Sequence, residues 1–76
     1  MAPDARTWID RYAAALGIGE LSPAEADALL DLAGTAAHAS ERTAAPLSCW
    51  LAATAGLTPT EALAVARDVA DSLRLT

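Results

Sequence analysis

Seventy-six residues with a net charge of −5 at pH 7 form a small acidic chain, long enough for one domain and too short for two. We expect no nucleic-acid partner and no membrane partner, because an acidic surface repels both the phosphate backbone and anionic lipids. The first residues do not resemble a signal peptide, and no apolar stretch approaches the roughly 18 residues that a membrane span needs. We therefore expect a cytoplasmic protein.

The sources of stability are limited by the same composition. Cys49 is the only cysteine, so an internal disulfide is excluded, and His38 is the only histidine. No ligand spacing connects the two, and nothing predicts a metal or another cofactor. The hydrophobic fraction of 54% is rich in alanine, the best helix former. We expect stability to come from helix packing or self-association. The alanine- and arginine-rich, lysine-free usage also indicates a GC-rich bacterial genome.

The first helix is predicted over residues 4–16, with Asp4 as its N-cap and Gly17 as its stop. Its apolar residues recur at i, i+1, i+4, i+5 and i+8, which places them on one helical face. These residues are Trp8, Ile9, Tyr12, Ala13 and Leu16. Ile18, in the loop that follows, is expected to fold back onto the core.

The second helix is predicted over residues 23–41, because Ser22 to Glu25 form a capping box with proline at the first helical position. One face of this helix is apolar. The opposite face carries polar residues at i, i+4, i+7 and i+11, namely Asp31, Thr35, His38 and Arg42.

The third helix is predicted over residues 45–55, with Thr43 as a candidate cap. It contains no charged residue, which is typical of a helix that is central or buried at an interface. One side carries the large residues Leu47, Trp50 and Leu51, and the other side is small and neutral.

The fourth helix is predicted over residues 59–73, after a stop at Gly56 and a second capping box from Thr58 to Glu61. Its inner face repeats with helical spacing at Ala62, Val65, Ala66, Val69, Ala70 and Leu73. No segment alternates as a strand does. The sequence therefore predicts an all-α fold, a compact bundle of four short helices that forms a single domain over residues 1–76.

The polar stripe on the second helix is the candidate ligand site. Asp31, His38 and Arg42 could bind an anion or a carboxylate, or take part in proton transfer. The structural alternative is a solvated face, or a clamp in which Arg42 or His38 holds the turn before Pro46. Cys49 could act as a nucleophile with His38 as its base. A cysteine beside Trp50 in a charge-free helix is more typical of a buried, unreactive thiol.

Several short segments together resemble a family of uncharacterised small actinobacterial domains. The matching segments are Trp8-Ile9, Leu16-Gly17-Ile18, Leu29-Leu30-Asp31-Leu32-Ala33, Ala37-His38, Glu41-Arg42 and Ala44-Ala45-Pro46-Leu47. The resemblance implies an accessory role, because members of that family occur alone, or beside or fused to guanylyltransferase-type proteins of molybdenum-cofactor (molybdopterin-guanine dinucleotide) biosynthesis. It implies no catalytic activity.

We therefore predict a non-catalytic helical interaction or accessory domain, which binds a protein partner or itself. Its interface would include Leu47, Trp50 and Leu51, because tryptophan is a common anchor of interfaces. The alternative is a small-ligand or anion-binding domain that uses the polar stripe. An enzyme with His38 as general base is the third hypothesis.

Overall fold

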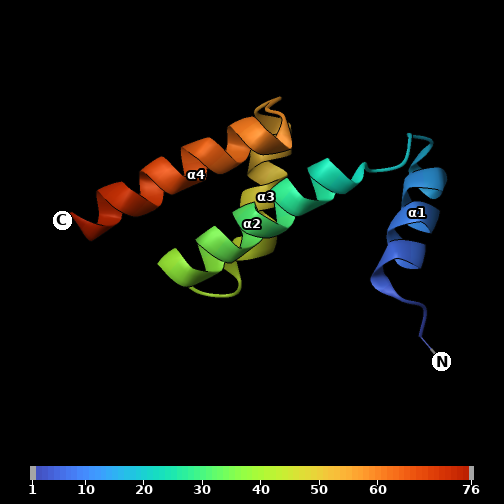
Figure 1. Cartoon of the computed structure of the whole chain (residues 1–76), viewed down its shortest axis with the longest axis horizontal. Coiled ribbons are helices and arrows are strands. Elements are labelled where there is room, and N and C mark those ends of the chain that lie inside the picture. Colours follow the sequence, from blue (N-terminus) through green and yellow to red (C-terminus); the bar gives the residue numbers. More distant parts are fainter. Residues whose placement is uncertain (1, 76) are drawn as a thin grey trace.

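In the computed structural model, residues 2–75 are described, and they form four α-helices and no strand (Figure 1). The helices are α1 (Ala5–Leu16), α2 (Pro23–Ala39), α3 (Ala44–Thr54) and α4 (Pro59–Arg74). The predicted all-α class and the order of the helices are confirmed. Residues 1 and 76 of the predicted domain lie outside the described range. None of the helices in this range has the length and apolar character that crossing a membrane requires.

Side-chain caps begin three of the helices. Both predicted capping boxes are present: in α2 the hydroxyl of Ser22 accepts from the Glu25 N–H while the Glu25 carboxylate accepts from the Ser22 N–H. Thr58 and Glu61 do the same in α4. At α1 the Asp4 carboxylate accepts from the Thr7 N–H at 2.8 Å. These bonds satisfy N–H groups that a helix end otherwise leaves without a partner.

Two predictions about helix ends need correction. Thr43 makes no capping hydrogen bond, and its backbone is already helical, so α3 begins without a side-chain cap. The second helix ends at Ala39 rather than 41, because Ser40 leaves helical geometry at φ −137° and ψ −100°. The predicted stops at Gly17 and Gly56 are confirmed by their positive φ angles of 75° and 76°, which glycine adopts without strain.

The core lies where α2 meets α3 and α4. Leu32 of α2 and the neighbouring Ala62 and Leu63 of α4 form a buried cluster. Partly buried side chains pack around it from all three helices; they are Leu29, Cys49, Ala52 and Ala66. The cluster is small, and alanine and leucine supply nearly all of it.

Helix α1 does not take part in this cluster and lies apart from α3 and α4 (Figure 1). The radius of gyration is 13.6 Å, whereas about 11 Å is typical of a compact domain of this length. The expected return of Ile18 to the core is wrong, because its side chain is exposed. The compact part of the bundle is therefore α2 to α4. On the apolar stripe of α1, Ala13 is buried, whereas Trp8, Tyr12 and Leu16 are more than half exposed.

Replacing Leu32 with alanine should lower the free energy of unfolding by about 2–5 kcal/mol, because it removes the centre of the buried cluster. Leu32 is 2% exposed, whereas Leu30, two residues earlier on the same helix, is 69% exposed. Leu30→Ala is the matched control and should change stability by less than about 0.5 kcal/mol. Urea unfolding followed by circular dichroism measures both, and equal losses would contradict this position for the core.

Acid should weaken the helix caps. The Ser22 N–H and the Thr58 N–H, which donate to the carboxylates, lower the pKa of Glu25 and Glu61 from the ordinary value of 4.5. A lowered folded-state pKa gives stability that is complete above pH 4.5 and is lost as the pH falls through the lowered values.

Urea unfolding between neutral and acidic pH measures this loss. In the Glu25→Gln, Glu61→Gln double variant the amides keep an acceptor oxygen but do not titrate, so stability should fall less steeply with acid. An identical acid profile in the two proteins would show that the caps do not contribute to it.

Candidate functional site

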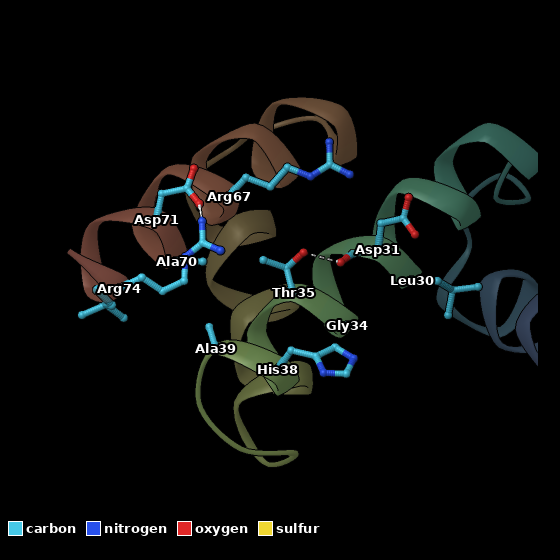
Figure 2. Close-up of a pocket in the computed structure, with 11 residues that line it drawn as sticks. Leu30, Asp31, Gly34, Thr35, His38, Ala39, Arg67, Ala70, Asp71 and Arg74 are labelled. Carbon is cyan, nitrogen blue, oxygen red and sulfur yellow. Dashed lines mark hydrogen bonds and ion pairs between the residues drawn. The ribbon is translucent and has the colours of Figure 1, made fainter. Parts of the chain in front are cut away.

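A cleft of about 760 Å³ lies between α2 and α4, on the side of the bundle shown in Figure 2. Each helix contributes polar side chains to its lining. Those of α2 are Asp31, Thr35 and His38, and those of α4 are Arg67, Asp71 and Arg74.

The spacing of the α2 residues explains how they come together. Asp31, Thr35 and His38 stand at i, i+4 and i+7, which places them on one side of the helix. The Thr35 hydroxyl donates to the backbone oxygen of Asp31 at 2.8 Å, so this donor is already used within the helix. The Asp31 and His38 side chains remain exposed to the cleft.

Arg42 is not among the residues that line the cleft. It lies past the end of α2, in the turn where its carbonyl accepts from the Ala45 N–H at 3.1 Å. Because the helix stops at Ala39, the i+11 position never joins the stripe. Within residues 2–75, neither Arg42 nor His38 makes a side-chain hydrogen bond of the kind that a clamp on the turn requires.

The α4 side of the cleft was not predicted as part of a site. Arg67, Asp71 and Arg74 follow the same i, i+4, i+7 spacing as the α2 stripe, and this repetition is the signal that the sequence offered. Asp71 and Arg74 form an ion pair within α4. Arg67 has no ion pair with any described residue, although the carboxylates of Asp31 and Asp71 line the same cleft.

The chemistry that this cleft can support follows from its openness. Its charged side chains are exposed, and exposed charges are screened by water. No group of three or more His, Cys, Asp or Glu side chains within the described range could hold a metal ion. Arg67 and His38 can therefore contact a small anion, in competition with the carboxylates of Asp31 and Asp71.

Cys49 and His38 lie in different surroundings. Cys49 packs against the Leu32, Ala62 and Leu63 cluster, whereas His38 lines the polar cleft, whose lining does not include Cys49. The fold therefore gives Cys49 a packing position and does not place it with His38 in one site.

Helix α3 presents its large side chains outward. Leu47, Trp50 and Leu51 are 65%, 73% and 66% exposed, while Cys49 and Ala52 on the small side pack on the core. A charge-free helix normally buries its larger side chains. Here the side that faces the core is the small one, and the large apolar side is left at the surface.

A second hollow, of about 390 Å³, lies between the C-terminal half of α2, α3 and α4. Apart from a few hydroxyl groups its lining is apolar, and alanines make up much of it. We call it the apolar groove. Leu51 lies at its edge, whereas Leu47 and Trp50 do not line it.

Comparison with known proteins gives a family but no activity. No curated protein and no solved structure matches the chain. A family model does match, over residues 2–74, which is nearly the whole chain. The chain belongs to the family described as a domain of unknown function, DUF6457.

Proposed function

We propose that this protein is a non-catalytic interaction domain that binds a protein partner through the outer face of α3. The observation that supports this is the exposed apolar surface of Leu47, Trp50 and Leu51 on a helix without charge. Burying these side chains against a partner would remove apolar area from water, and no charged group of α3 would have to lose its hydration.

The spacing of the three residues fits a known mode of recognition. Leu47, Trp50 and Leu51 stand at i, i+3 and i+4, the pattern by which a helix lays one face into an apolar groove of its partner. Trp50 is central in this set, and tryptophan often carries a large share of binding energy. We therefore assign Trp50 as the anchor of the proposed interface.

The family resemblance supplies the first partner to test. The resemblance implies that such domains occur alone, or beside or fused to guanylyltransferase-type proteins of molybdenum-cofactor biosynthesis. We propose an accessory role in that pathway, in which the domain docks to such an enzyme and leaves the chemistry to it.

Trp50→Ala should weaken binding to the guanylyltransferase-type protein by about 2 kcal/mol or more, as truncation of an interface anchor does. Isothermal calorimetry with the purified proteins measures the loss. Leu30→Ala is the control, because it removes a similarly exposed leucine from α2, outside the α3 face. Unchanged binding by Trp50→Ala would exclude the α3 face as the docking surface.

A second candidate function is anion binding in the polar cleft, and the presence of both Arg67 and His38 in its lining supports it. Phosphate or a molybdopterin nucleotide should change the NMR shifts of His38 and of residues around Arg67. Arg67→Gln should abolish the change, whereas Arg11→Gln, on α1 and outside the cleft, should not. An absence of shift changes in the wild-type protein would eliminate this candidate.

A further inference from the structure

The chain exposes more surface than a compact monomer of its size. Its accessible surface is 5873 Å² for a mass of 7.7 kDa, whereas a compact monomer of that mass exposes about 4,300 Å². The excess is about 1,500 Å², more than the roughly 800 Å² that each partner buries in a stable interface. The molecule therefore has enough uncovered surface for a specific dimer.

One part of this surface is the apolar groove. Along α4 its lining includes both buried and exposed side chains: Ala62 is 4% exposed, whereas Val69 is 53% exposed. The groove follows α4 from Ala62 to Leu73, a length of about 17 Å at the helical rise. Alanines along its walls leave room for large side chains from outside.

The other part is the apolar stripe of α1. Trp8 and Tyr12 stack with their ring centroids 5.9 Å apart, and both are exposed together with Ile9 and Leu16. Helix α1 has 12 residues, so it is about 18 Å long and matches the groove in length. Its large side chains would face the alanines that make up much of the groove.

From these two surfaces we infer that the protein forms a symmetric dimer in which α1 of each copy lies in the apolar groove of the other. Exchange of an identical element is a low-cost route to a dimer, and two-fold symmetry lets both grooves be filled at once. The α1 stripe and the apolar groove of both copies would then be covered, while Leu47 and Trp50 on α3 would stay exposed.

Charge is compatible with this arrangement. Residues 4–16 carry two arginines and two aspartates, so the net charge of −5 belongs to the rest of the chain. Helix α1 together with its N-cap Asp4 is therefore neutral and can approach the acidic α2 to α4 of another copy without the repulsion that two acidic bodies would feel.

The segment that joins α1 to α2 favours binding of α1 in the groove of a second copy over binding in the groove of its own chain. At its start Gly17 and Ile18 N–H groups bond back to α1, and at its end the Ser22 capping box is fixed to α2. Between them Glu20 pairs with Arg6, with 3.7 Å from Oε2 to Nη2. The short segment left between the caps directs α1 away from α3 and α4 (Figure 1).

Analytical ultracentrifugation of the full chain at micromolar concentration should give twice the monomer mass of 7.7 kDa. Trp8→Ala should weaken the dimer roughly 30-fold, the effect of losing an interface anchor. Val69→Glu should abolish it by placing a charge in the groove. Ala64→Glu adds the same charge to α4 outside the groove and should leave the dimer intact.

Mixing the two defective chains tests the exchange itself. The Trp8→Ala chain keeps a normal groove, and the Val69→Glu chain keeps a normal α1, so a mixed dimer has one intact contact. It should form at a concentration at which neither variant dimerises alone. A wild-type monomer would overturn the inference, and so would a dimer that is insensitive to Trp8→Ala, or variants that do not complement each other.

The results of these experiments can be distinguished from those that test the proposed function. A strictly monomeric chain that still binds its partner through Trp50 would remove the exchanged dimer and leave the α3 interface in place. Concentration-dependent blue shift of Trp8 emission in a Trp50→Phe background gives a second readout. A blue-shifted emission that does not change with concentration would show that α1 occupies its own groove, and would overturn the inference.

Discussion

The contact of Leu32 with Ala62 and Leu63 is the one on which the rest of the fold depends. It joins α2 to α4, and Cys49 and Ala52 attach α3 to the same cluster. The cluster and the side chains packed on it are leucines, alanines and Cys49, so among residues 2–75 no aromatic ring belongs to it. The aromatic side chains of Trp8, Tyr12 and Trp50 lie on the surface instead. The exposed apolar faces are thus a result of how the core is built.

The helices themselves could be read from the sequence, because the signals that begin and end them are local. A capping box needs only the four residues from Ser22 to Glu25, and a stop needs only a glycine such as Gly17. The direction in which α3 faces could not be read in this way. Because α3 has no charged residue, its two faces differ mainly in the size of their side chains. Burial of apolar area favours placing the face with the larger side chains in the core. The alanine-rich neighbours, which come from α2 and α4, reverse that choice.

The candidate site was accessible to prediction only in part, for the same reason. The spacing of Asp31 and His38 places them on one stripe whatever the neighbours are. Arg67 lines the same cleft as Asp31 and His38 only because α4 packs against α2. The way two helices pack depends on residues far apart in the sequence. Arg42 does not line the cleft, because α2 ends at Ala39, before the helix reaches the position of Arg42. The end of α2, two residues earlier than predicted, therefore leaves Arg42 outside the cleft.

A core this small connects stability to binding. The free energy of unfolding of a small domain is only about 5 kcal/mol. A partner that binds only the folded state, present at a hundred times its dissociation constant, adds about 2.7 kcal/mol to it. Contacts on the α3 face or in the apolar groove are therefore comparable with the stability of the isolated chain. Such contacts would also stabilise the polar cleft between α2 and α4, because a partner that holds these two helices together also fixes the distance between His38 and Arg67. Stability, docking and any ligand binding in this fold thus depend on the same crossing of α2 with its neighbours.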